Sequence, residues 1–259
     1  MSPVIQPRPG DFLTIDVVWP PARGIPAWRR AVRAALAGGL DGLRAATVNH
    51  ANNGTHSIVP KVVPGGCALV AAWDSPEAAA QAWRGPLSAA LDGRGRFSMD
   101  GEVARVRRQH DGDTWHGWSP SADGAEPLAT DEPLAVVVHG VLRPRHLAGF
   151  LRNNMHAASR AAHHPGHRGS ADISSKLPFE HTSISLWKTV ASAQDYAYAA
   201  GGHAHAMKHA LTADTHRAGV FLRVRPLAST GRLGIDAPAF PHLPPAERGR
   251  LSTASGVTR

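Results

Sequence analysis

The chain has 259 residues, of which 42% are hydrophobic, so it can form one large domain or two small ones with a sizeable core. Its formal charge is +8, but the arginines are scattered and form no long basic run. Because no nucleic-acid-binding motif accompanies this charge, we expect a solvated basic surface or an anionic small ligand, and no nucleic-acid partner.

The sequence also indicates in which cellular compartment the protein is expected. No run of 18 apolar residues is present, and the first residues lack the apolar stretch of a signal peptide. We therefore expect no integral membrane segment. The single cysteine, Cys67, excludes an internal disulfide and favours the reducing cytoplasm. It lies in an apolar segment, which favours a small buried side chain over a nucleophile.

The first half alternates between strand-like and helix-like segments. Three prolines among residues 1–10 predict an extended arm. Alternating or apolar β-prone segments predict strands at 11–19, 43–49, 67–73 and 103–107. Helices are predicted at 26–37 and 76–91, each with a proline in its first turn, and a polar loop at 50–66.

The second half shows a similar order of segments. Predicted strands cover 133–142, 181–187 and 219–225. Predicted helices cover 145–162 and 190–211, the second interrupted by Gly201-Gly202. Residues 163–177 are polar and predict a loop.

An internal repeat supports a two-part fold. A strand, a tryptophan, a polar residue, a helix cap and an Ala-rich helix follow one another in AAWDSPEAAAQAW and again in SLWKTVASAQDYA. Trp73 and Trp187 are therefore 114 residues apart (187 − 73). Each half is interpreted as a ferredoxin-like β-α-β-β-α-β unit, and two such sheets can pack face to face. We predict an α+β barrel, a pseudo-dimer in one chain.

The predicted boundaries follow the repeat. The N-terminal half is assigned to residues 1–125 and the C-terminal half to 126–243, with a mobile tail at 244–259. Aligned on the tryptophans, His203 falls opposite Ala89 (203 − 114), and the first half has no histidines there. Repetition of the fold therefore does not explain the second-half histidines, which favours a cofactor in that half alone.

A sequence pattern in the second half carries a family resemblance. Ser185-Leu186-Trp187 is followed by Ala197-Tyr198, by His203, and by a strand containing Phe221-Leu222-Arg223. A glycine-rich segment, Gly231-Arg232-Leu233-Gly234, comes next. This pattern, over roughly residues 175–235, resembles the spheroidene monooxygenase family of carotenoid-modifying enzymes. The resemblance implies a heme-dependent dimeric α+β barrel, and a homodimer is compatible with it.

The resemblance also points to site residues. It implies heme b with His203 as the axial ligand, because a helix histidine commonly binds heme iron. The preceding glycine pair would let a flat macrocycle approach the backbone. His205 is the second candidate ligand. Trp187 and Tyr198 are expected to contact heme or to belong to the core, and Arg223 to pair with a propionate.

Other interpretations of these residues stay open. His203 could be a surface histidine. His205 and His209, at i and i+4, could bind zinc, although no HExxH motif is present. The histidines of 163–167 suggest a solvated loop or a lid, and His139, in mid-strand, suggests a hydrogen-bonded core residue.

The next strand and the acidic residues add further candidates. Arg223 and Arg225 alternate with apolar residues, so one face of their strand should point into the barrel, and a buried arginine needs an anion. The alternative is an exposed strand face. No catalytic residue can be assigned, and no pattern supports Asp172 or Glu180 as a general base.

The sequence therefore predicts an oxidoreductase, a heme-dependent monooxygenase acting on an apolar or biosynthetic small molecule. One alternative is a heme-dependent dehydratase of the aldoxime dehydratase type, acting on a nitrogen-containing substrate. Another is a cofactor-free barrel that binds a small molecule. No GxSxG motif, phosphate-binding loop or dinucleotide fingerprint points to other chemistry.

Overall fold

A computed structural model describes residues 11–20, 24–51, 66–88, 94–176, 179–199, 215–246 and 248. The predicted N-terminal arm, most of the 50–66 loop and residues 200–214, with His203, His205 and His209, lie outside the described residues. No described helix is both long and apolar enough to cross a membrane.

Eight strands and four α-helices make up the described fold, with one short 3-10 helix before α3. The strands are β1 (Phe12–Trp19), β2 (Leu43–Ala51), β3 (Gly66–Trp73), β4 (Arg94–Arg108), β5 (Leu134–Leu142), β6 (His167–Ser174), β7 (Glu180–Trp187) and β8 (His216–Gly231). The helices are α1 (Ile25–Ala37), α2 (Pro76–Arg84), α3 (Leu147–Ala162) and α4 (Val190–Tyr198).

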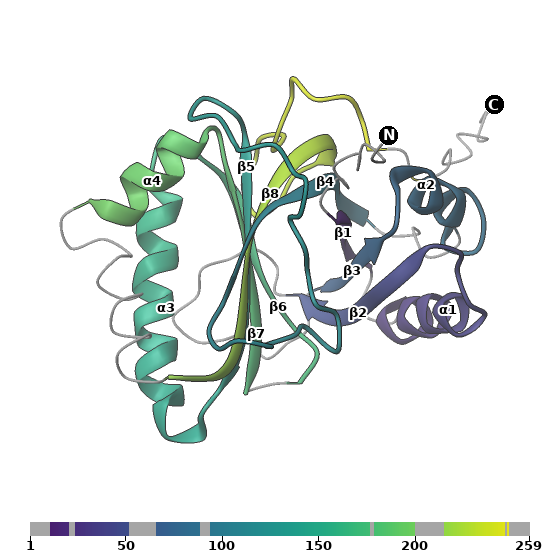
Figure 1. The fold of residues 1–259 in the computed structure, drawn as a ribbon, viewed down its shortest axis with the longest axis horizontal. Helices are drawn as coiled ribbons and strands as arrows, with labels where there is room; N and C mark the ends of the chain where they lie inside the picture. The colour runs from purple at the N-terminus through teal and green to yellow at the C-terminus, as the bar shows by residue number, and fades with distance from the viewer. Residues whose placement is uncertain are drawn as a thin grey trace, which may run out of the picture.

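The strands form one closed, antiparallel barrel in the order β1-β3-β2-β6-β7-β5-β8-β4. Within each half the order is the same, β4-β1-β3-β2 and β8-β5-β7-β6. The halves join through a long β4–β8 pairing and a short β2–β6 pairing. Figure 1 shows α1 and α2 on one side of the barrel and α3 and α4 on the opposite side.

The repeated sequence pattern occupies matching positions in the two halves. Trp73 pairs with the first residue of β1, and Trp187 pairs with the first residue of β5. Two residues after each tryptophan, a hydroxyl caps the next helix. The Ala78 amide donates to Ser75 Oγ at 3.1 Å, and the Ser192 amide donates to Thr189 Oγ1 at 3.0 Å.

The prediction of a loop at 163–177 is wrong, because His167–Ser174 forms strand β6 between β2 and β7. Ala171 and Ile173 point into the barrel core. The alternate positions, Ser170 and Asp172, are only partly buried. A strand with a polar outer face carries few apolar residues, so its composition resembles that of a loop.

The helix predicted for 76–91 is also too long, since α2 ends at Arg84. Gly85 and Pro86 follow, and the residue before a proline is disfavoured in the helical conformation. Strands β4 and β8 are longer than the segments predicted for them, because the pairing between them extends from Phe97 to Arg108.

The core has two main parts. The inward side chains of both sheets meet inside the barrel, among them Ile15, Phe97, Val137 and Leu222. A second cluster lies between α1, α2 and the outer face of the first sheet. Cys67 is fully buried there, and burial raises the pKa of its thiol to about 11, so the thiol stays protonated and inert.

The beginning of the predicted mobile tail is instead packed against the first half. The Arg248 side chain is buried, and its Nε donates to Asp16 Oδ1 at 2.9 Å. The guanidinium also pairs with Asp100 and lies 4.8 Å from the centre of the Trp83 ring. Ala246, likewise buried, donates its amide to Thr230 Oγ1 at 3.0 Å. The packed chain therefore extends beyond residue 243.

Arg248→Ala should lower the free energy of unfolding by about 3–5 kcal/mol, because it removes the guanidinium that forms an ion pair with the buried Asp16 carboxylate. The control is Arg232→Ala, which removes an exposed i,i+4 pair with Asp236 and should cost less than about 1 kcal/mol. Urea denaturation of both variants measures the difference. Equal losses in the two variants would show that the buried pair does not anchor this segment.

Candidate functional site

The two helical layers bury their sheets to different extents. On the first sheet, β3 is buried on both faces. On the second sheet, many of the side chains that point away from the barrel interior stay partly exposed, and we call the surface that these form the outer face. It comprises Val136, Val138, Asp172, Ser183, Ser185, Phe221 and Arg223.

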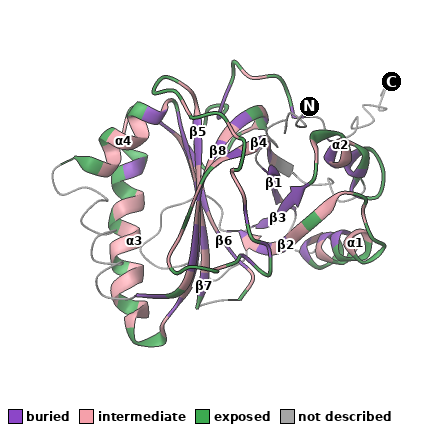
Figure 2. Cartoon of the chain, viewed as in Figure 1, coloured by how far each residue is buried: buried purple, intermediate pink, exposed green. Residues whose placement is uncertain are grey.

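Helix α3 covers the outer face without filling it. Only Ala161 of its 16 residues is buried, whereas the shorter α2 buries Ala79, Ala82 and Trp83. Figure 2 shows the contrast, with α3 almost entirely intermediate or exposed and β1 and β3 largely buried.

Side chains near the start of α3 and in its second half contact the sheet and α4. Near the start of the helix, the Phe150 ring lies 4.3 Å from the His181 ring, centre to centre. Near the end, the Tyr196 hydroxyl of α4 donates to the Ala157 carbonyl at 2.7 Å, and Ala161 belongs to a cluster with Trp187. Between these anchors, Val138 and Phe221 of the outer face remain partly exposed.

A pair of histidines, with His216 buried and His181 partly buried, lies at one end of the outer face. The Nε2 atoms of His181 and His216 are 3.0 Å apart, and both Nδ1 atoms are buried without a hydrogen bond to any described residue. Gly140 lies against them, since a Cβ there would come within 2.5 Å of His216 Cδ2. A glycine is therefore needed at this position of β5.

Burial keeps both histidines neutral. It lowers the pKa of His216 to about 4 and, together with the charges of His216 and His139, lowers the pKa of His181 well below its usual value. No motif in the sequence marks this pair, because its members are 35 residues apart and meet only through strand pairing. Because their Nε2 atoms bond to each other, the two neutral imidazoles have one N–H donor and one acceptor at their Nδ1 atoms, so the pair can hold or relay a proton.

The predicted aromatic residues have different environments. Trp187 is buried, stacks on Tyr196 with ring centres 4.8 Å apart, and donates from Nε1 to Ser185 Oγ at 3.0 Å. Trp187 therefore belongs to the small core at one end of the outer face. Tyr198 is 73% exposed at the end of α4, so Tyr196 takes the packing position next to Trp187.

The expectation of an arginine inside the barrel is wrong. Leu222 and Val224 point into the core, which puts Arg223 and Arg225 on the opposite face of β8. Arg225 pairs with Glu102 at 2.8 Å and with Glu132 at 3.4 Å. Among the described residues, no carboxylate pairs with Arg223, which is partly exposed and lies opposite Val136 of β5. Arg223 therefore offers its charge to an anion on the outer face.

The histidine-rich segment 163–167 braces the end of the site. His164 Nε2 lies 3.1 Å from Asp195 Oδ2, and its ring packs edge-on against Trp187. His167 is the first residue of β6 and packs on the same tryptophan. These contacts link the end of α3 to β6 and α4, so they stabilise the packing of this segment.

Stability should fall as the pH drops from 7 to 5, because the unfolded chain takes up protons on histidines whose folded pKa values are depressed. For His216, with a folded pKa of about 4, the loss is about 2 kcal/mol over this range. His216→Leu should therefore flatten the pH dependence by that amount in urea denaturation at pH 7 and 5. Exposed His156→Ala is the control. An unchanged slope in His216→Leu would contradict burial of a neutral histidine.

No family model and no curated protein matches the chain, so membership of the spheroidene monooxygenase family stays a prediction. Solved structures do match. A structure of aldoxime dehydratase has a TM-score of 0.56 at 10% identity, covering 87% of this chain and 83% of its own. Aldoxime dehydratase OxdRE in complex with butyraldoxime has a TM-score of 0.56 at 11% identity, covering 84% and 80%.

A heme-degrading enzyme from Listeria monocytogenes matches more weakly. Its TM-score is 0.28 at 10% identity, with 82% of this chain and 98% of its own covered. At these identities the aldoxime dehydratase structures show a shared fold, a mixed α/β architecture with a closed antiparallel barrel in this chain.

Proposed function

We propose that the protein is a heme-dependent enzyme that oxygenates a small apolar molecule, with heme b between the outer face and α3. The observation that carries the proposal is the poor burial of α3, which covers the second sheet yet buries only Ala161. A protein interior normally fills such a space with side chains, as α1 and α2 do in the first half.

The described residues fit a heme in three respects. The middle of the outer face carries Val138 and Phe221, which suit an apolar macrocycle. Arg223 can pair with a propionate. Arg223 is paired with Val136 of β5, and His181 is paired with Gly140 of the same strand. These two positions are four residues apart (140 − 136), which is about 13 Å along the strand and suits the width of a porphyrin.

The axial ligand in this proposal is His203, the fifth residue after the end of α4 at Tyr198 (203 − 198). His205 is the second candidate. Helix α4, which ends at Tyr198, lies on the same side of the second sheet as α3, and β8 begins at His216, which contacts His181 at one end of the outer face.

Each described residue then has a defined task. When bound, heme would supply an iron centre for the activation of dioxygen or peroxide. Arg223 would fix the orientation of the ring by charge-assisted hydrogen bonding. Val138, Phe221 and Phe150 would exclude water and hold an apolar substrate. His181 and His216 would hold or pass a proton at their Nδ1 atoms.

The histidine pair also favours a second candidate, dehydration of an aldoxime-like substrate. Loss of water from such a substrate requires a proton on the departing hydroxyl, and the neutral pair would relay that proton through its hydrogen-bonded Nε2 atoms and its Nδ1 atoms rather than supply it. Two of the matched structures are aldoxime dehydratases. To distinguish the two reactions, a polyene and an aldoxime are added in separate experiments to the heme-loaded protein. The compound that is converted and that shifts the Soret band identifies the reaction.

Purified protein should show a Soret band, directly or after addition of hemin, and His203→Ala should lose or shift that band. Loss of the axial imidazole changes the iron's coordination, which the absorption spectrum reports. His156→Ala, an exposed variant on α3, should behave as wild type. A change in His205→Ala alone would move the ligand to His205. Colourless protein that takes up no hemin would exclude the proposal and favour a cofactor-free barrel.

Arg223→Gln should weaken hemin binding by about tenfold, the contribution of one partly exposed charge-assisted pair. Its free energy of unfolding without heme should change little, since no described carboxylate pairs with Arg223. Arg225→Gln provides the matched comparison, because it breaks the pair with Glu102 and should lower stability without changing hemin affinity. Hemin titration and urea denaturation measure both effects. Equal hemin affinities in the two variants would remove Arg223 from the site.

A further inference from the structure

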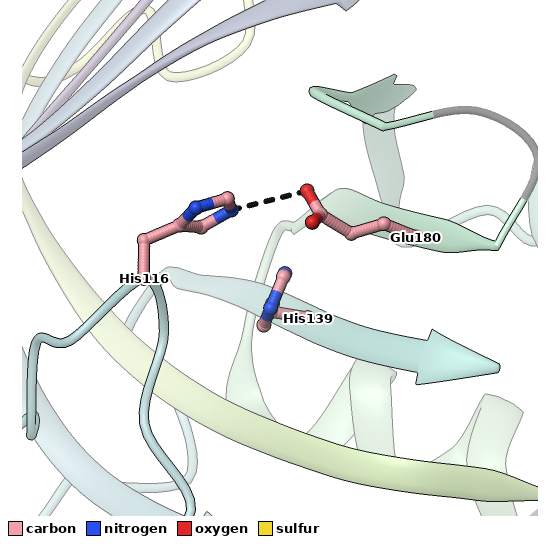
Figure 3. A group of neighbouring side chains, drawn as sticks. All are labelled: His116, His139 and Glu180. Carbon is pink, nitrogen blue, oxygen red and sulfur yellow. Dashed lines mark hydrogen bonds and ion pairs between the residues drawn. The ribbon is translucent and has the colours of Figure 1, made fainter.

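A second group of side chains converges on the opposite side of the second sheet. His116, His139 and Glu180 each offer a nitrogen or oxygen atom, and these three atoms lie within 4.8 Å of one another. Figure 3 shows them approaching from a loop and two strands. His139 and Glu180 are buried, whereas His116 is partly exposed, so the group lies at an accessible end of the barrel.

Strand pairing brings two of these residues together. His139 of β5 is opposite Thr182 of β7, and Glu180 is opposite Val141, the next inward position of β5. Val137 on β5 and Ile184 on β7 belong to the barrel core. Because side chains alternate along a strand, His139 and Glu180 point to the same interior.

The third residue, His116, lies in a tight hairpin turn. The Trp115 amide donates to the Trp118 carbonyl at 2.8 Å, and the Trp118 amide donates back at 3.0 Å. The two residues between them, His116 and Gly117, have φ angles of 52° and 86°. Such a turn usually carries asparagine and glycine, so a histidine in this conformation is unusual. Both tryptophans are buried in the barrel core, which anchors the hairpin.

Surrounding contacts orient the donor atoms. His139 Nδ1 lies 3.0 Å from Thr182 Oγ1, and the Trp115 ring stacks on the imidazole at 5.0 Å with an interplanar angle of 13°. This arrangement leaves Nε2 of His139 for a ligand, since ligand histidines characteristically bond through their other nitrogen to a supporting group. The Ser175 hydroxyl and His116 Nε2, the latter at 3.1 Å, contact Glu180 Oε1.

Protonation states agree with the geometry. Burial lowers the pKa of His139 to about 4. Burial acts to raise the pKa of Glu180, but hydrogen bonds from His116 and Ser175 and the nearby histidine charges outweigh it, so the pKa falls to about 2. At neutral pH both groups are therefore in the unprotonated form that a metal ligand requires.

We propose that His116, His139 and Glu180 bind one divalent transition-metal ion, of the class of Fe²⁺, Co²⁺ or Zn²⁺. Two imidazole nitrogens and one carboxylate oxygen suit such ions better than Ca²⁺ or Mg²⁺, which prefer all-oxygen ligands. Three protein ligands leave positions open for water or a small molecule, which can enter past the exposed edge of His116.

The site is independent of the proposed heme. His139 points into the barrel, while its neighbour Gly140 lies against His181 and His216 on the outer side. Likewise, Glu180 points into the barrel and contacts His116, whereas its neighbour His181 points to the outer side and contacts His216. A structural ion pair between His116 and Glu180 would explain their contact but would not require His139, so variants of all three residues distinguish the two interpretations.

Titration of the full-length protein with Co²⁺, followed by its visible absorption and by calorimetry, tests the site. We expect one equivalent bound by the wild type. Affinity should fall at least about 100-fold in His116→Asn, His139→Gln and Glu180→Gln, because each variant removes a ligand. Asparagine tolerates a positive φ, so His116→Asn keeps the hairpin, and its unfolding curve without metal should match the wild type. Thr182→Val should weaken binding about 10- to 100-fold by releasing His139.

Two variants serve as controls. His110→Ala changes an exposed histidine in the same connecting segment, and His205→Ala changes a histidine outside the described residues. Both should bind Co²⁺ as the wild type does. Absence of a Co²⁺ band in the wild type, or unchanged binding in His116→Asn and Glu180→Gln, would overturn the proposal. If only His205→Ala lost Co²⁺ binding, the proposal would also be overturned, and the metal would be assigned to His205 and His209.

Discussion

Closure of the barrel is the constraint on which the rest of the structure depends. Each sheet has an apolar inner face, and only the other sheet can remove it from water, so the alternation of every strand is fixed by burial. A shift of one residue in β5 would exchange its two faces. It would turn His139 toward the helices and move Gly140 into the core, away from the histidine pair that it accommodates on the outer side. Both sites described above therefore depend on one strand register.

The two halves use the same order of strands and helices for different purposes. In the first half, Trp28, Trp83 and the buried Arg248 fill the outer side of the sheet, so that side serves stability. In the second half, α3 buries only Ala161 of its 16 residues. A ligand would supply the missing apolar contacts. This difference in packing between two similar layers is the reason why the proposed ligand site is placed in the second half.

Buried histidines are the other distinctive feature of the second half. His139, His181 and His216 lie on three neighbouring strands, β5, β7 and β8, and neighbouring histidines add to burial in lowering the pKa values of His139 and His181. Glu180 opposes that effect for His139 and His181. Neutral imidazoles are costly to bury for stability alone, since they lose protons that the unfolded chain would keep in acid. Their number here agrees with tasks in ligand binding and proton transfer.

The sequence by itself determined most of the local structure, because the determinants lie close together in the chain. Alternation marked β1 and β7, and Ser75 and Thr189 marked two helix starts, each confirmed by a hydrogen bond across three residues. Strand β6 was missed because Ser170 and Asp172 face a poorly filled layer, which only the assembled fold reveals. His203 was singled out by its glycine neighbours and a family pattern, and remains a prediction. The pairing of His181 with His216 and the grouping of His116, His139 and Glu180 were decided by tertiary structure alone. Pairing of β5 with β7 and β8, and packing of the Trp115–Trp118 hairpin in the core, join residues that are far apart in the sequence and carry no shared local signal.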